Sequence, residues 1–181
     1  MKLASHNSGT GEKPYNIWAK LFGIFCKCQD KTIAEQYQTG VRLFDLRVRE
    51  IDGVWRLCHG IAQYNKTLDE VFTEFLALHY KTNEDLIVML TYEGKASPSK
   101  EYWFIEEMTS MVSKYPYILL GSISIKKPKW KTLVMTKNQP TCIQNYPKLI
   151  GWKALLPIPI LWNIFKKTID SDECYVMEDF I

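Results

Sequence analysis

The chain has 181 residues, of which 46% are hydrophobic and 24% are charged, an ordinary globular balance with enough chain for one well-packed domain over residues 1–181. The formal net charge of +3 suits a weakly anionic partner such as a phosphate or lipid headgroup. It lacks the dense basic patch that nucleic-acid binding needs, so we expect no nucleic-acid partner.

The five cysteines argue against a disulfide framework, because their number is odd and their spacing is irregular. Cys26 and Cys28 have no second pair or nearby histidine to complete a tetrahedral metal site. No signal peptide is visible, and no apolar run approaches the ~20 residues of a membrane span. We expect a cytoplasmic monomer that is able to lie at a membrane surface.

Hydrophobic periodicity and turn signals predict strands at 2–6, 41–49, 54–58, 85–92, 132–135 and 175–177. They predict helices within 14–28, at 30–39, from 67, from 97 to about 115 and at 160–168, so that helices and strands alternate along much of the chain. The third helix opens on a capping box, Thr67-Leu68-Asp69-Glu70. The run 86–90 is continuously apolar, which is typical of a strand buried on both faces. This alternation predicts an α/β fold with a mostly parallel sheet.

Several residues that can carry chemistry fall at or near the carboxyl ends of these strands, where α/β folds place their sites. They are His6, Arg47, His59, Glu93, Lys137 and Asp179. One histidine can take a proton while the other gives one, and a guanidinium between them can hold a phosphoryl group. A nearby carboxylate can orient a histidine. The set indicates a metal-free phosphodiester-transfer site, whereas His79 is expected to be incidental.

Three ordered motifs carry a family resemblance: ASHNSGT at 4–10, QYQTGVRLFDLR at 36–47 and LCHG at 57–60. Together they resemble the X-domain of phosphatidylinositol-specific phospholipase C of the bacterial type. The resemblance continues more weakly through 86–93 and 131–137. The stretch 176–181 resembles the last barrel strand of that family.

The resemblance implies that His6 is the general base, His59 the general acid and Arg47 the residue that stabilises the phosphate. Asp45 would support this site and Asp179 would orient His6. The implied reaction is attack of the inositol 2-hydroxyl on phosphorus with departure of diacylglycerol, which gives a cyclic phosphodiester. The implied partners are a phospholipid or inositol-phosphate headgroup and a membrane surface.

Asn7, Lys137 and Glu93 are expected to bind the substrate. Asn7 stands where the bacterial enzymes carry aspartate and looks like the calcium-dependent eukaryotic form. That form, however, needs acidic ligands where this chain has Arg47 and Thr91. We therefore expect no metal cofactor, and a Ca²⁺ site is disfavoured.

The resemblance also sets an expectation for the fold, since a complete (β/α)₈ barrel takes ~250 residues. With six clear strands, we expect a shortened or partly open TIM-like (β/α) barrel with mostly parallel strands. Further strands could lie at 117–120 and 123–125. If the last strand instead matches the sixth of the family, Asp179 loses its role and the chain is a fragment.

The segment from Trp18 to Phe25 occupies the place of a membrane-touching helix in that family. We expect Trp18, Phe22 and Phe25 to contact the membrane, although the same side chains could simply cover the end of the barrel. Two other functions stay open. One is a metal-dependent glycerophosphodiester phosphodiesterase or phospholipase D-like enzyme, and the other is a lipid-headgroup binding module with a decayed site.

Overall fold

The computed structural model describes residues 2–95, 97–126, 131–135, 142–144 and 175–178. The strands are β1 (Lys2–Ser5), β2 (Val41–Ile51), β3 (Val54–His59), β4 (Ala62–Thr67), β5 (Leu86–Tyr92), β6 (Ile118–Lys126), β7 (Lys131–Met135), β8 (Cys142–Gln144) and β9 (Tyr175–Glu178). The helices are the 3₁₀ turn η1 (Ser8–Gly11), α1 (Ile17–Cys26), α2 (Ile33–Gln38), α3 (Leu68–Thr82) and α4 (Pro98–Ser113).

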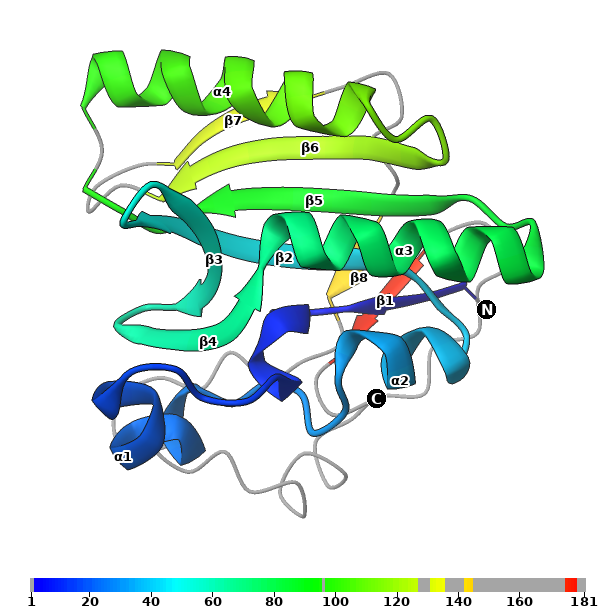
Figure 1. The fold of residues 1–181 in the computed structure, drawn as a ribbon, viewed down its shortest axis with the longest axis horizontal. Coiled ribbons are helices and arrows are strands. Elements are labelled where there is room, and N and C mark those ends of the chain that lie inside the picture. Colours follow the sequence, from blue (N-terminus) through cyan, green and yellow to red (C-terminus); the bar gives the residue numbers. More distant parts are fainter. Residues whose placement is uncertain (1, 96, 127–130, 136–141, 145–174, 179–181) are drawn as a thin grey trace.

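The strands of the described part form one sheet in the order β7-β6-β5-β2-β1-β9-β8, with β3 attached to β2 and β4 to β3. The core pairs β1–β2, β2–β5, β5–β6 and β1–β9 are parallel, whereas β2–β3, β3–β4 and β6–β7 are antiparallel. The predicted α/β class is therefore confirmed, with a mixed sheet. Because the described strands end at β7 on one side and β8 on the other, this sheet is open (Figure 1).

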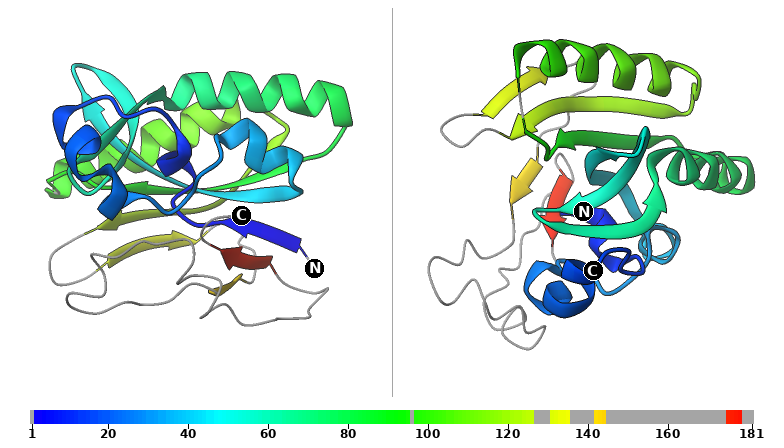
Figure 2. Two further views of the ribbon diagram at one scale, coloured as in Figure 1. Left: turned by 90° about the horizontal axis from the view of Figure 1, so that it is seen from below. Right: turned by 60° about the vertical axis from the view of Figure 1, so that its left-hand side comes forward.

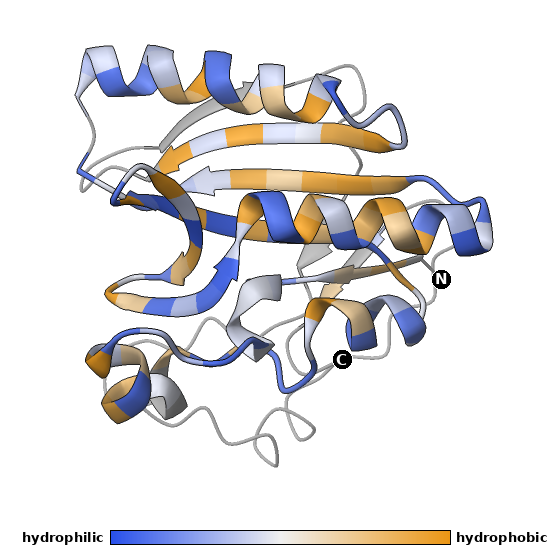
Figure 3. Cartoon of the chain, viewed as in Figure 1, coloured by the Kyte–Doolittle hydropathy of each residue, from blue (hydrophilic) through white to orange (hydrophobic). Residues whose placement is uncertain are grey.

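Apolar side chains fill the layer between the sheet and helices α2, α3 and α4, which lie on the same side of it (Figure 2). Leu86, Val88 and Leu90 of β5 are fully buried in this core, and Figure 3 shows the apolar character of the central strands. The ring of Phe44 on β2 lies 4.8 Å from that of Phe75 on α3. Burial of this face ties the long helices to the strands that carry the candidate site residues.

Helix boundaries follow the local sequence signals. Thr67 and Glu70 form the expected capping box at the start of α3. A second capping box joins Thr32 and Glu35, and Thr32 is the N-cap of α2. Gly40 follows this helix with a φ of 97°, a left-handed conformation that glycine adopts without steric cost.

The sequence-based prediction did not include every strand of the sheet. The strand β4 was not predicted, and residues 118–126 form the single strand β6 where two short segments had been considered. The predicted strand at 132–135 corresponds to β7, which runs antiparallel to β6. The predicted helix at 160–168 lies outside the described residues.

Candidate active site

The side chains of β2 alternate between the two faces of the sheet, and this alternation places the charged residues. Phe44 and Leu46 belong to the core beneath the helices, whereas Leu43 belongs to a separate apolar cluster with Ala4 and Met177. Asp45 and Arg47 share the period of Leu43, so they lie on the face opposite the helices. β2 thus contributes apolar side chains to the core on one face and charged side chains to the other face.

His6 lies immediately after β1, at the carboxyl end of the parallel strands and beside β2. Asn7 follows in a left-handed conformation with a φ of 47°, which turns the chain into η1. The backbone N–H of Asn7 donates to Asp45 Oδ2 at 3.3 Å. The loop is thereby joined to the strand that carries Arg47.

Buried amide and hydroxyl groups hold this loop from the other side. Gln36 is fully buried and donates to the carbonyl oxygen of Ser8 at 2.8 Å, and Gln29 donates to that of His6 at 3.0 Å. The Thr10 hydroxyl accepts the backbone N–H groups of Cys28 and Gln29 at 2.9 Å each. These residues position His6 although they have no place in the chemistry.

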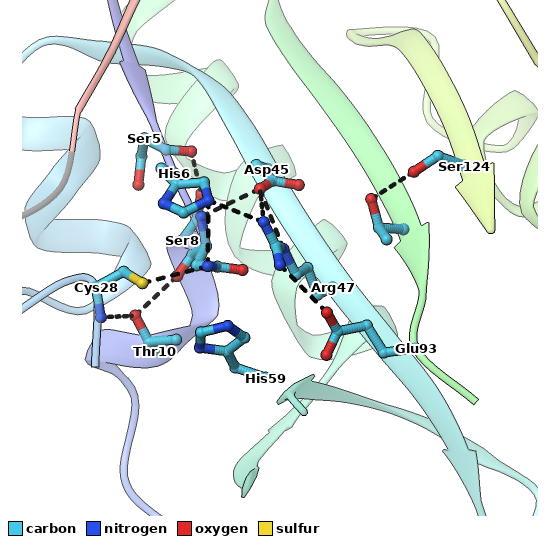
Figure 4. Close-up of polar contacts among 12 residues, drawn as sticks. Ser5, His6, Ser8, Thr10, Cys28, Asp45, Arg47, His59, Glu93 and Ser124 are labelled. Atoms are coloured by element: carbon cyan, nitrogen blue, oxygen red, sulfur yellow. Dashed lines mark hydrogen bonds and ion pairs between the residues drawn. The ribbon is translucent and has the colours of Figure 1, made fainter. Parts of the chain in front are cut away.

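The guanidinium of Arg47 connects the polar groups of the site (Figure 4). Its Nη2 lies 2.8 Å from Nε2 of His6, its Nη1 donates to Glu93 Oε1 at 3.2 Å, and both Nε and Nη2 lie 3.3 Å from Asp45 Oδ2. The side chain of Arg47 is 19% exposed, whereas those of Asp45 and Glu93 are 7% and 1% exposed. The guanidinium is therefore the most accessible charge of this group.

These contacts keep the ion pairs charged. Burial alone would raise the pKa of Asp45, but the charges of Arg47 and His6 and the Asn7 N–H outweigh it and lower that pKa. Burial would lower the pKa of Arg47, and the carboxylates of Asp45 and Glu93 raise it instead. Arg47 thus keeps a full positive charge between the two carboxylates and His6.

His59, the last residue of β3, approaches from the antiparallel hairpin. Its Nδ1 donates to the carbonyl oxygen of Cys26 at 2.7 Å, because a carbonyl can only accept, and this leaves the lone pair on Nε2. Burial lowers the pKa of His59; the Cys26 bond and Glu93 oppose this, while the charges of Arg47 and His6 add to it. The two histidines and Arg47 therefore lie within electrostatic range of one another (Figure 4).

This pKa shift predicts how stability depends on pH. The folded-state pKa of His59 lies below its ordinary value of 6.5, so the unfolded chain takes up the proton first as the pH falls. The stability that neutral His59 contributes is complete above that value and is lost as the pH falls toward the folded-state pKa. Between about pH 7.5 and 5.5, the wild type should lose more free energy of unfolding in urea than His59→Gln. Equal losses would contradict this prediction.

Glu93 joins the two halves of the site. It follows β5, and its Oε1 accepts from Arg47 while its Oε2 accepts the backbone N–H of Gly60, next to His59. Arg49 donates to the carbonyl oxygens of Glu93 at 3.0 Å and Gly60 at 2.7 Å. Sequence analysis placed Glu93 among the substrate-binding residues, but with both oxygens engaged and 1% of the side chain exposed, this arrangement favours a positioning role.

Asn7 differs from Glu93, because one of its side-chain polar atoms is not engaged. Its Nδ2 lies 3.3 Å from His6 Nε2 and 3.2 Å from the Cys28 sulfur, while its Oδ1 is buried and has no hydrogen-bond partner. A buried acceptor without a partner is costly, so a ligand donor at this oxygen would stabilise the site. The expected substrate-binding role of Asn7 stays a prediction that this oxygen supports.

The structure thus brings His6, Asn7, Asp45, Arg47, His59 and Glu93 together from β1, β2, β3 and β5. Asp179 and Lys137 lie outside the described residues, and their roles stay predictions. Sequence reasoning did not single out Gln29, Gln36 and Arg49. Of these, Gln36 opens the second motif, and this is the one signal that could have identified it.

The carboxylates of the site are paired with Arg47, and the expectation of no metal cofactor stays a prediction. In the part of the chain that the structure describes, no group of three or more His, Cys, Asp or Glu side chains is placed to hold a metal ion. The two carboxylates that face the histidines, Asp45 and Glu93, both bind Arg47. Both carboxylates of this group are thus paired with the guanidinium.

An exposed apolar face lies beside the site on α1. Ile17, Trp18, Leu21 and Phe22 are 62%, 48%, 64% and 41% exposed, and the rings of Trp18 and Phe22 stack at 5.8 Å. The side chain of Phe25 lies outside the described residues. Among the described residues, no helix combines the length and apolar character needed to cross a membrane.

Both ends of α1 are bonded to the hairpin of His59. Asn16 caps the helix by accepting the Ala19 N–H at 2.9 Å, and its Nδ2 donates to the carbonyl oxygen of Ile61 at 2.9 Å. At the other end, the carbonyl of Cys26 accepts from His59. The exposed face is thereby fixed in place relative to one of the candidate catalytic histidines.

Comparisons with known proteins identify a fold. No protein-family model matches the chain, and no curated protein matches its sequence. The phosphatidylinositol-specific phospholipase C of Listeria monocytogenes aligns with a TM-score of 0.59 at 14% identity, over 99% of this chain and 88% of that one. A variant of the Staphylococcus aureus enzyme aligns with a TM-score of 0.60 at 11% identity, over 99% and 85%.

A second S. aureus structure of the same enzyme aligns with a TM-score of 0.47 at 18% identity, and there the chain spans 47% of the length of that enzyme. At these identities the likeness concerns the backbone and carries no residue roles. The α/β fold of this chain is similar to that of bacterial phosphatidylinositol-specific phospholipases C.

Proposed function

We propose that this chain is a phosphodiesterase that cleaves phosphatidylinositol-type phospholipids through paired histidine acid–base catalysis. The observation that carries the proposal is the contact of Arg47 with His6, with His59 within electrostatic range, at the carboxyl ends of the parallel strands. The likeness in fold to the bacterial enzymes supports the same reaction class.

In the proposed reaction, His6 takes the proton of the inositol 2-hydroxyl as that oxygen forms a bond to phosphorus. The bond from phosphorus to the diacylglycerol oxygen breaks, and this oxygen receives a proton from His59. The product is a cyclic inositol phosphate. Arg47 offsets the negative charge that develops on the phosphoryl oxygens.

The lowered pKa of His59 fits this scheme once the substrate is present. In the unliganded protein, burial and the charge of Arg47 hold His59 neutral. A phosphodiester anion beside the ring favours the charged form and raises its pKa, so substrate binding itself prepares the acid. The unpartnered oxygen of Asn7 would accept a hydrogen bond from a headgroup hydroxyl.

A turnover assay without metal ions tests the function. In the presence of EDTA, the purified chain should release cyclic inositol phosphate from phosphatidylinositol vesicles, because Arg47 supplies the charge that a cation would bring. Product formed only after Mg²⁺ is added would favour the metal-dependent phosphodiesterase instead. Vesicle binding with no product under either condition would favour the decayed binding module.

We further propose that α1 docks on the membrane surface. Removing Trp18 and Phe22 together (Trp18→Ala, Phe22→Ala) should weaken sedimentation with phosphatidylinositol vesicles by about tenfold or more, because each side chain is about half exposed and burying that part contributes about half of the roughly 1.5–3 kcal/mol of a full burial. The control is Tyr80→Ala, which removes a 72% exposed aromatic ring from α3 and should leave binding unchanged. Equal weakening by both variants would argue against docking through α1.

A further inference from the structure

Arg47 determines which nitrogen of His6 carries the ring proton. A guanidinium has only N–H donors, so the His6 Nε2 that lies 2.8 Å from Arg47 Nη2 must accept. The Asn7 Nδ2 at 3.3 Å is a second donor to the same atom. Neutral His6 therefore carries its proton on Nδ1, and its basic lone pair already accepts a hydrogen bond from Arg47.

The contacts of Arg47 are unequal. The contact with His6 is 2.8 Å long, whereas the three contacts with Asp45 and Glu93 are 3.2–3.3 Å long. Charge-assisted bonds between a guanidinium and a carboxylate are ordinarily about 2.7–2.9 Å. The carboxylates thus hold Arg47 in the site with long bonds, and Nη2 faces the histidine.

A phosphate group would compete for that nitrogen. It offers two oxygens in the geometry that matches the fork of a guanidinium, and it carries a negative charge where a neutral imidazole carries none. The 19% exposure of the Arg47 side chain leaves a route for an anion, whereas Asp45 and Glu93 are nearly inaccessible. An anion entering the site would therefore meet the guanidinium before the carboxylates.

We propose that Arg47 acts as a phosphate-operated latch on His6, an inference that rests on the proposed phosphodiesterase function. Without phosphate, Arg47 covers the basic nitrogen of His6. When a phosphoryl group binds, Nη2 turns from the imidazole to a phosphoryl oxygen and uncovers the lone pair. The base then becomes available to the attacking hydroxyl only when phosphorus is in place.

Nitrogen NMR of the full chain with ¹⁵N-labelled histidine tests the latch. The His6 signals are assigned by their absence in His6→Ala. In the unliganded protein, His6 should show the Nδ1–H form with a hydrogen-bonded Nε2. Adding inorganic phosphate should shift the His6 Nε2 resonance toward that of a nitrogen that has lost its shorter hydrogen bond and keeps only the 3.3 Å contact with Asn7 Nδ2, while the His79 resonances stay in place.

The variant Arg47→Met separates the latch from a direct effect of phosphate. In this variant, the His6 Nε2 resonance should already have, without phosphate, the chemical shift that the wild type reaches with phosphate. Adding phosphate should not change that shift. A proton on Nε2 in the unliganded wild type would overturn the proposal. So would phosphate binding, seen as ³¹P line broadening, with no shift at Nε2, or an absence of phosphate binding altogether.

Turnover distinguishes a failure of the latch from a failure of the proposed function. Release of cyclic inositol phosphate with an unresponsive His6 signal would reject the latch and keep the function. A phosphate-dependent shift without turnover of phosphatidylinositol would keep the latch and reject that substrate class.

Discussion

Alanine at His6 or His59 is expected to lower the turnover of phosphatidylinositol by about 10²–10⁴-fold, because each variant loses one positioned proton transfer. The two side chains reach the site from different strands and both lie within electrostatic range of Arg47. Initial rates of cyclic inositol phosphate release in EDTA provide the measurement. Unchanged turnover in either variant would remove that histidine from the proposed mechanism.

The double variant His6→Ala, His59→Ala tests whether the two histidines act in the same step. If the two histidines act in one concerted displacement, removing both should cost little more than removing one, since residues that act as a unit are strongly non-additive. Costs that multiply would instead indicate two independent contributions. The matched control is His79→Ala, because His79 stacks on Tyr117 at 3.7 Å and contacts the carbonyl oxygen of Glu84 just before β5, at the amino ends of the parallel strands and not at the carboxyl ends where the site lies. Its loss should leave turnover in place.

Replacing Glu93 with alanine should lower the free energy of unfolding by about 3–5 kcal/mol, the cost of breaking a buried ion pair from one side. The substitution leaves Arg47 Nη1 and the Gly60 N–H without their acceptor in a place where the side chain was 1% exposed. Urea unfolding monitored by tryptophan fluorescence measures the loss. A change below about 1 kcal/mol would show that Glu93 is not needed to hold the site together.

Two variants make this result specific. Glu93→Gln keeps an acceptor of the same shape and should lose less stability than alanine, which separates hydrogen bonding from charge. Glu84→Ala removes another glutamate paired with an arginine, but the Glu84 side chain is 51% exposed, so it should cost only about 0–1 kcal/mol. Equal losses at Glu84 and Glu93 would contradict the argument from burial.

Local signals in the sequence predicted the elements that local chemistry determines. The capping box at Thr67 and the apolar run of β5 both correspond to observed structure. The family resemblance named Asp45 together with Arg47, and the alternation of β2 places both on one face. These features depend on residues that are close in sequence, where periodicity and propensity are informative.

Pairing between distant segments could not be predicted in the same way. The strand β4 reads AQYNKT, which has little strand propensity, and it becomes a strand because it pairs with β3 across the turn at Gly60. The bond of His59 to the Cys26 carbonyl joins residues 33 positions apart. The engagement of both Glu93 oxygens likewise depends on where β2, β3 and β5 meet, so the sequence could place Glu93 near the site without revealing its partners.

The position of β1 between β2 and β9 has a consequence for biosynthesis. On the ribosome, β1 can pair with β2 soon after both emerge, but its other edge has to wait for residues 175–178, the last described strand to be made. Closing so long a loop is slow, and until then the strand that leads into His6 has an unpaired edge. A nascent chain therefore completes the pairing of the strand that leads into His6 only after residues 175–178 have been made.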